Sequence, residues 1–331
     1  MSESATDREL IEALGGRIDG HEIVGLERRP YRYATSASLE ELVVTTRDGG
    51  RTTLILKDLS RERLLGDARS TKPEFLHEPR RELETYRRIL GPAGVGPRCI
   101  GAVSRSDPER HWLFIEKVEG VELWQVGELS VWEHVAGWVG GFHAGFAGRV
   151  DELRSANPHL LEHSEAWFRS WHERASEALA QSTDDRAPAL ARALERYGEV
   201  AEALAALPRT FVHGELYPSN VIVVRDRDPL GVYPLDWEMA AIGSGLIDLA
   251  ALSGGWAAAE RRRLEDAYGA GLVGAGGSLP DSHELEASLA RCRLQLALQW
   301  LGWSADWAPP PEHAHDWLGE ALALAGELKL R

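Results

Sequence analysis

The sequence predicts an α+β fold in two lobes, a small β-rich N-terminal lobe and a larger α-helical C-terminal lobe. Strand-like segments dominate the first third of the chain, and helical segments dominate the rest. A short stretch at 117–122 breaks both patterns and separates the two regions. The length of 331 residues also suits two lobes, because domains usually contain roughly 100–200 residues. We therefore place the lobes at residues 1–118 and 119–331.

The expected N-terminal lobe combines strands with two helices. Gly15-Gly16 ends a first short helix, and Gly91-Pro92 ends a longer one. Asp48-Gly49-Gly50 indicates a tight hairpin between two strands, and Asp107-Pro108 marks a turn between two others. In chain order the predicted elements are a helix at 7–16, strands at 21–28, 39–46 and 51–59, a helix at 73–90, and strands at 99–104 and 111–118.

The expected C-terminal lobe is mostly helical from residue 131 onward. Apolar residues recur there at helical spacing, namely Trp132, Val135, Ala136, Val139 and Phe142. Further long helices are predicted at 162–180 and 188–207, and helices resume toward the C-terminus. A pair of strands, at 210–224 and 230–236, interrupts the helices.

Composition and charge exclude several classes of protein. The net charge of −15 disfavours binding to nucleic acid or anionic membranes; it serves solubility and is compatible with a cationic small substrate. No apolar run of about 18 residues predicts a membrane span. The acidic N-terminus lacks the blocks of a signal peptide. Cys99 and Cys292, the two cysteines, are too few and too far apart for a disulfide framework, which suits the cytoplasm.

The stretch HGELYPSN, residues 213–220, lies between two apolar runs and carries the first chemical signal. Glu215 can accept a proton from a hydroxyl group. Asn220, and Asp236 further along the chain, can offer oxygen atoms to Mg²⁺, which prefers oxygen ligands and keeps several waters. Phosphoryl transfer needs little beyond such positioning and charge neutralisation. This set of residues therefore favours a phosphoryl-transfer site.

Three motifs together resemble the aminoglycoside phosphotransferase and choline kinase family, a small-molecule branch of the kinase-like fold. That family carries His-Gly-Asp followed after four residues by Asn, and residues 213–220 match it with Glu215 in place of the aspartate. Its metal-binding stretch is matched at 235–238, and its later Gly-rich stretch leading to Asp-Leu-Ala at 243–250. The resemblance covers most of 20–325 and implies a bilobal protein-kinase-like fold.

The resemblance also implies a nucleotide site in the N-terminal lobe. Lys57, at the end of a predicted buried strand, would hold the phosphates of ATP, and Glu82 would pair with Lys57. Glu78, one helical turn earlier, is the second choice for that partner. Backbone groups near Glu116 and Val118 would contact adenine.

Two departures from the family pattern matter. Glu215 is longer than the family aspartate, and a displacement of about 1 Å can cost about 10²-fold in rate. Either the loop is reset, or activity is weak, or the acceptor sits differently, or Glu215 is structural in a degenerate kinase. No Gly-rich phosphate loop is present at 29–38, where Ser36 and Ser38 could meet the phosphates or simply keep the loop soluble.

Several other residues carry a functional and a structural interpretation. Asp248 is expected to fix the 213–220 loop from beneath, His213 to orient that loop, and His143 to pack in the core. Glu238 could contact the substrate or assist Mg²⁺, or remain a supporting residue.

The late tryptophans form a second ambiguous group. Trp300, Trp303 and Trp307 recur at helical spacing, with Asp306 beside them. They could wall an acceptor pocket and hold an ammonium group by cation–π attraction, with Trp303 and Asp306 as substrate contacts. Core packing is the alternative.

The sequence therefore predicts a cytoplasmic, ATP- and Mg²⁺-dependent phosphotransferase acting on a hydroxyl of a small polar molecule. An aminoglycoside, an aminosugar, a choline-like compound or another natural product would all fit. A nucleotide-binding pseudokinase with a regulatory or partner-binding role is the alternative, and nucleotidyl transfer is a third interpretation.

Overall fold

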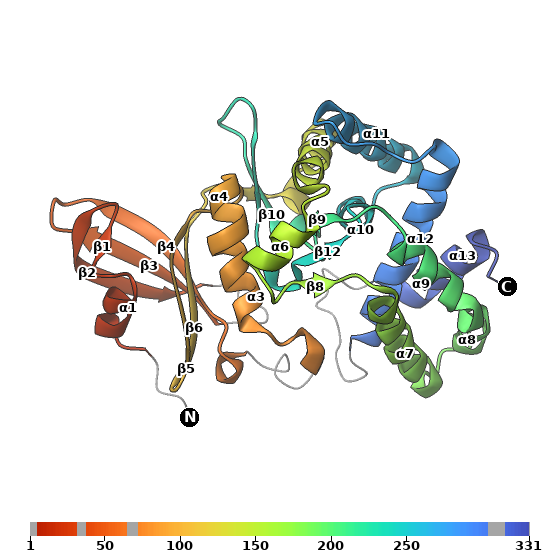
Figure 1. The fold of residues 1–331 in the computed structure, drawn as a ribbon, viewed down its shortest axis with the longest axis horizontal. Coiled ribbons are helices and arrows are strands. Elements are labelled where there is room, and N and C mark those ends of the chain that lie inside the picture. Colours follow the sequence, from red (N-terminus) through yellow and green to blue (C-terminus); the bar gives the residue numbers. More distant parts are fainter. Residues whose placement is uncertain (1–4, 32–37, 65–71, 304–314, 331) are drawn as a thin grey trace. The chain divides into compact units, whose positions relative to one another are not determined.

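The computed structural model describes residues 5–31, 38–64, 72–303 and 315–330. The chain divides into two compact units, Met1–Gly120 with Tyr233–Glu238, and Val121–Val232 with Met239–Arg331. The first unit is built on one large sheet and the second mainly from helices, so the predicted α+β class is confirmed (Figure 1). In the described residues, none of the helices has both the length and the apolar character needed to cross a bilayer.

A six-stranded antiparallel sheet of order β1-β2-β3-β4-β6-β5 forms the first unit. The expected hairpin joins β3 to β4: Thr46 N donates to Gly50 O at 3.0 Å, and Gly49 takes a φ of +88° that glycine adopts without strain. The core on this sheet includes Leu42, Val44, Leu54, Leu56 and Phe114. The strands are β1 (Arg17–Ile18), β2 (His21–Pro30), β3 (Ser38–Thr46), β4 (Arg51–Asp58), β5 (Cys99–Ser106) and β6 (Glu109–Glu116).

Two helices accompany this sheet, α1 (Asp7–Ala13) and a composite helix. The composite helix runs through α3 (Pro79–Glu84), a π-helical turn (Thr85–Leu90) and α4 (Gly91–Ala93), and α3 lies along β6 (Figure 1). The prediction that this helix begins at residue 73 is wrong, because Pro79 lacks the N–H of a helix interior and therefore starts α3. A separate 3₁₀ turn, Glu74–Leu76, precedes it.

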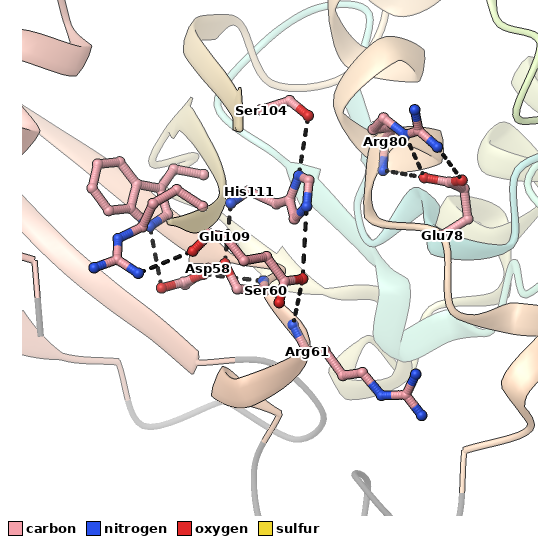
Figure 2. A network of polar contacts seen from close by, with 10 residues as sticks. Asp58, Ser60, Arg61, Glu78, Arg80, Ser104, Glu109 and His111 are labelled. Carbon is pink, nitrogen blue, oxygen red and sulfur yellow. Dashed lines mark hydrogen bonds and ion pairs between the residues drawn. The ribbon is translucent and has the colours of Figure 1, made fainter. Parts of the chain in front are cut away.

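A polar network ties the chain after β4 to the β5–β6 hairpin (Figure 2). His111 N donates to Ser60 Oγ at 3.1 Å, and the His111 ring lies 3.1 Å from Ser104 Oγ on the neighbouring strand. Glu109 accepts the backbone N–H of Arg61 at 3.3 Å. These bonds fix the end of the strand that carries Lys57.

The second unit holds most of the helices, the small sheet of order β8-β12-β9, and strands β7 and β10 of the sheet of order β11-β10-β7. The predicted strand at 210–224 is two strands, β9 and β10, with residues 213–220 between them. The predicted helix at 188–207 is also divided, by a 3₁₀ turn at Leu194–Arg196. The elements are β7 (Val121–Glu122), α5 (Leu129–Phe146), α6 (Val150–Ala156), β8 (Leu161–Glu162), α7 (Glu165–Gln181), α8 (Ala187–Ala193), α9 (Tyr197–Ala205), β9 (Thr210–Val212), β10 (Val221–Val224), β11 (Gly231–Pro234), β12 (Ala241–Gly243), α10 (Leu246–Leu252), α11 (Ala258–Gly274), α12 (Ser282–Gly302) and α13 (Trp317–Glu327).

Helices α5 and α11 of the second unit lie side by side and pack closely (Figure 1). Glycines make this approach possible: a Cβ atom on Gly140 would lie 2.1 Å from Tyr268 O, and one on Gly271 would lie 1.8 Å from Gly137 O. Because α5 also carries His143, this packing positions a side chain of the candidate site.

Candidate active site

Lys57 lies near the end of β4, where its ammonium group meets two carboxylates. The lysine stands opposite Leu113 in the register of β4 and β6 and is 7% exposed. Its Nζ lies 2.8 Å from Glu82 Oε2 and also contacts the carboxylate of Asp236. The expected Lys57–Glu82 ion pair is therefore present, and Asp236 belongs to the same cluster.

Glu78, the alternative partner of Lys57, has a different role. Its side chain accepts the backbone N–H of Arg80 at 3.1 Å and so caps α3. The carboxylate also pairs with the Arg80 guanidinium, as Figure 2 shows. Because Pro79 occupies the first helical position, Glu78 is held outside the helix as its cap.

Burial and the acidic side chains nearby together set the charge of Lys57. Burial alone would lower the pKa of Lys57. The charges of Asp236, Glu82 and Glu238 together outweigh that effect and raise the pKa well above its ordinary value. Burial raises the pKa of Glu82 to about 7; Lys57 opposes this rise, and Asp236 and Glu238 add to it. Lys57 therefore stays charged, and the nearby Glu238 carboxylate is balanced by its own partner, Lys72.

Residues 236–238, which we name the DWE turn, are held in an unusual conformation. Asp236 has a φ of +62°, in the left-handed region that few non-glycine residues adopt and that Asp tolerates better than most. Trp237 is 1% exposed; its backbone N–H donates to Glu82 Oε1 at 3.2 Å, and its indole N–H donates to Pro234 O at 3.2 Å.

Glu238, for which we considered a contact with substrate or Mg²⁺, is engaged elsewhere. Its Oε2 lies 2.6 Å from Lys72 Nζ, and its backbone carbonyl accepts a hydrogen bond from Arg81 Nη1 at 2.7 Å. The side chains of Lys72 and Glu238 are 9% and 14% exposed, respectively. This geometry supports the alternative interpretation of Glu238 as a supporting residue.

The expected adenine contacts lie where β6 ends. Glu116 is the last residue of β6, and its backbone N–H and carboxylate are bonded to Arg98. Val118 lies two residues further on. Its backbone N–H donates to no backbone carbonyl within the described ranges. Ser38 begins β3, opposite Asp58, whereas Ser36 lies outside the described residues.

In the second unit, residues 213–220, which we name the HGE loop, are anchored by a buried carboxylate. Asp248 is 1% exposed; its Oδ2 accepts the N–H of His213 at 2.7 Å, and its Oδ1 accepts that of Gly214 at 2.9 Å. His143 Nε2 lies 3.2 Å from Asp248 Oδ2, and His143 Nδ1 lies 3.0 Å from Tyr268 Oη. The expected anchoring by Asp248 and the core position of His143 are confirmed.

Backbone geometry then sets the polar side chains of the HGE loop. Gly214 has a φ of +86°, and a Cβ atom there would lie 2.4 Å from Met239 O, so only glycine fits. Glu215 N donates to His213 Nδ1 at 3.3 Å, which confirms the orienting role expected of His213. Asn220 Nδ2 donates to Glu215 O at 3.0 Å, so the amide oxygen of Asn220 remains an acceptor.

A tyrosine outside the predicted site residues links the HGE loop to α12. Trp300 Nε1 donates to Tyr217 Oη at 2.7 Å, and the Trp300 ring stacks on Trp317 with centroids 5.1 Å apart. Burial and the negative charge of Glu215 raise the pKa of Tyr217, against a lowering by Trp300, so its phenol is neutral at physiological pH. Its position two residues after Glu215 was the signal that could have found it.

The two late tryptophans that the structure describes, Trp300 and Trp303, stack on different partners. Helix α12 ends at Gly302, and Trp303 stacks on the buried Trp171 with centroids 6.0 Å apart. Packing therefore explains Trp303 better than acceptor binding. Asp306 and Trp307 lie outside the described residues.

A model of the phosphotransferase enzyme family matches residues 36–286, which is most of the chain and includes the Lys57 cluster and the HGE loop. The chain belongs to this family. No curated protein matches the sequence closely enough to count as a relative.

Solved structures resemble this phosphotransferase over nearly its whole length, beyond the residues that the family model matches. Macrolide 2′-phosphotransferase MphH from Brachybacterium faecium is 17% identical, with 97% of each chain covered and a TM-score of 0.57. Choline kinase LicA from Streptococcus pneumoniae is 14% identical, with 98% of each chain covered and a TM-score of 0.60. An ethanolamine kinase from Plasmodium vivax is 12% identical over 91% of this chain and 82% of its own, with a TM-score of 0.56. The kinase-like fold is thereby confirmed.

The donor set of this phosphotransferase can be tested for its fit to magnesium. In the described part of the chain, no three residues of the types His, Cys, Asp and Glu gather into a metal-binding group. Mg²⁺ bound together with nucleotide phosphates needs only one or two protein carboxylates, because phosphates and waters complete its shell. The partly exposed Asp236 carboxylate and the amide oxygen of Asn220 are of the required type.

Proposed function

We propose that this phosphotransferase transfers the γ-phosphoryl group of ATP to a hydroxyl of a small polar molecule. The observation that carries the proposal is the buried Lys57, paired with Glu82 and touching Asp236. Burying a lysine among carboxylates is costly unless the charges are compensated. Binding of a polyphosphate and a divalent cation at this site would explain why these charged side chains are buried together.

The nucleotide would be held by residues of the first unit. Lys57 would bind the phosphates, Ser36 and Ser38 would meet them through backbone N–H or hydroxyl groups, and backbone groups of Glu116 and Val118 would contact the base. The solved neighbours support nucleotide use: LicA has been crystallised with AMP, spectinomycin phosphotransferase with ADP, and aminoglycoside 2′-phosphotransferase IIIa with GDP.

Magnesium would be held by Asp236 and Asn220. When bound, it neutralises charge on the phosphates during transfer. Asp236 is already presented by the DWE turn, and Asn220 is oriented by its own bond to Glu215 O.

Glu215 would orient the acceptor hydroxyl and take its proton. The Asp248 anchor supports this role, because it fixes the backbone immediately before Glu215. Neighbours whose names include choline, ethanolamine and spectinomycin support an acceptor that carries an amine as well as a hydroxyl. Trp303 and Asp306 stay weaker candidates for acceptor contacts.

A nucleotide-binding pseudokinase is the second candidate, favoured by one observation, the glutamate at position 215. Replacing Glu215 with Asp separates the two. If Glu215→Asp lowers turnover, the loop is built for glutamate. If only the Glu215→Asp variant turns over ATP, the natural protein is a degenerate, inactive kinase.

The direct experiment is a coupled ATP-turnover assay with Mg²⁺ over a panel of amine-bearing alcohols. Turnover with at least one acceptor, lost in Asp236→Asn, is the expected result. Absence of turnover with every acceptor, together with absence of nucleotide binding in thermal-shift titrations, would reject the proposal.

A further inference from the structure

The DWE turn carries a backbone conformation that its own sequence does not favour. A non-glycine residue at a φ of +62° persists only where its surroundings hold it. Three polar contacts reach Trp237 and Glu238 from a single segment of the first unit, residues 72–82. These contacts hold the two residues that follow Asp236, and so they help to fix the direction of its carboxylate.

Glu82 makes the first contact and serves two groups at once. Its Oε2 pairs with Lys57 at 2.8 Å, and its Oε1 accepts the N–H of Trp237 at 3.2 Å. The same carboxylate therefore sets the position of the lysine and that of the residue next to Asp236.

Arg81 and Lys72 make the other two contacts. Arg81 holds the backbone carbonyl of Glu238, and Lys72 holds its side-chain carboxylate. Arg81 Nη1 donates to Glu238 O at 2.7 Å and to Leu76 O at 3.1 Å, while Lys72 pairs with the Glu238 carboxylate at 2.6 Å. Arg81 is 3% exposed, and burial lowers its pKa to about 10. Burial of a charged guanidinium group is unfavourable unless hydrogen bonds compensate for its lost hydration. The bonds of Arg81 to the two carbonyl oxygens provide that compensation.

The neighbouring arginine provides a contrast. The side chain of Arg80 is 51% exposed and bonds to the carboxylate of Glu78, one residue before α3 (Figure 2). Arg80 and Arg81 thus share a helix and a chemical group, but Arg81 is buried against the DWE turn and Arg80 points to solvent beside the helix cap.

We propose that Arg81 and Lys72 are positioning residues that clamp the DWE turn to residues 72–82 and so present Asp236 to the metal. This inference rests on the magnesium role proposed for Asp236. It assigns to Glu238 a holding role, through Lys72, in place of a contact with the acceptor.

The test measures the dissociation constant of a non-hydrolysable ATP analogue by calorimetry, once in EDTA and once in Mn²⁺. The ratio of the two constants is the metal-dependent gain in nucleotide affinity, called the gain below. Five forms are compared: wild type, Asp236→Asn, Arg81→Met, Arg81→Lys and the matched control Arg80→Met. Arg81→Met is expected to reduce the gain about 10- to 100-fold, the usual effect of removing a group that orients a metal ligand. Its affinity in EDTA should stay close to that of wild type. Arg81→Lys should recover part of the gain, and Arg80→Met should keep all of it.

The outcomes separate this inference from the function on which it rests. If Asp236→Asn leaves the gain unchanged, the proposed magnesium role fails and the clamp fails with it. If Asp236→Asn abolishes the gain but Arg81→Met does not reduce it, the clamp alone is rejected. Equal weakening of Arg81→Met in EDTA and in Mn²⁺ would also reject it, as general structural damage. Should Arg81→Met not fold, Lys72→Met combined with Glu238→Gln is judged by the same criteria.

Discussion

The carboxylate of Asp248 accepts the backbone N–H of Gly214 at 2.9 Å. The same carboxylate accepts the N–H of His213 at 2.7 Å, so one buried acid fixes two consecutive peptide groups of the HGE loop. Glu215 follows directly. The direction of the candidate base therefore depends on a residue more than thirty positions later in the chain.

Replacing Asp248 with Asn should misplace the HGE loop. An amide has one acceptor oxygen, so one of the two N–H groups would face an NH₂ group, at a cost of about 1.5–3 kcal/mol for the lost charge-assisted bond. We expect a lower kcat with little change in nucleotide affinity, measured by steady-state kinetics and calorimetry. An unchanged kcat would show that the anchor does not act on Glu215.

The helix contact between α5 and α11 predicts opposite effects for two glycines of α5. Gly140→Ala places a methyl group 2.1 Å from the Tyr268 carbonyl, and backbone cannot move aside cheaply, so a loss of roughly 1–3 kcal/mol is expected. A Cβ atom on Gly145 would meet no atom within 4 Å, so Gly145→Ala should be neutral or stabilising by up to about 1 kcal/mol. Urea denaturation measures both, and equal effects would contradict the close approach.

His163 predicts a pH dependence of stability in the second unit. The ring is 6% exposed, its Nδ1 has no hydrogen-bond partner among the described residues, and burial lowers its pKa to about 4, against an opposing effect of Asp248. Between pH 6.5 and 4 the unfolded chain therefore binds a proton that the folded chain does not, so stability falls as pH falls through this window. The total loss is about 3 kcal/mol.

The variant His163→Gln should flatten that decline, because glutamine does not titrate. The exposed histidine His21, changed to Gln, serves as the matched control and should leave the slope as in wild type. Denaturation at several pH values gives the answer, and an unaltered slope in His163→Gln would exclude His163 as the source.

Variants of Tyr217 and Trp300 can show whether the Tyr217 hydroxyl group contacts the acceptor substrate or only holds the HGE loop. Trp300 donates to the Tyr217 oxygen, and in the part of the chain that the structure describes no acceptor takes up the tyrosine's own proton. If that proton serves the acceptor substrate, Tyr217→Phe should raise the KM for the acceptor more than Trp300→Phe does. Equal effects, with no added loss in the double variant, would show that the bond only holds the loop in place.

Much of the site follows from the sequence, because motif spacing places each residue on a strand end or a tight loop. Lys57 with Glu82, and Asp248 beneath the HGE loop, were expected and are in contact. The choice of Glu82 over Glu78 depends on Pro79, whose place at the start of α3 turns Glu78 into a cap.

The remainder depends on contacts between segments distant in sequence, which no local pattern encodes. Arg81 reaches a carbonyl 157 residues later, and Trp300 a hydroxyl 83 residues earlier. The tryptophan spacing left packing and acceptor binding open for the same reason, because the ring that stacks on Trp303, Trp171, lies more than a hundred positions earlier in the chain.

The most direct measurement is the mass of the acceptor after incubation with ATP and Mg²⁺, for wild type and for Glu215→Gln. We expect a product heavier by one phosphoryl group, formed about 10²- to 10⁴-fold more slowly by Glu215→Gln, which should still bind nucleotide. An acceptor that gains a nucleotidyl group, or equal rates of phosphorylation by both forms, would contradict the proposed roles of ATP and Glu215.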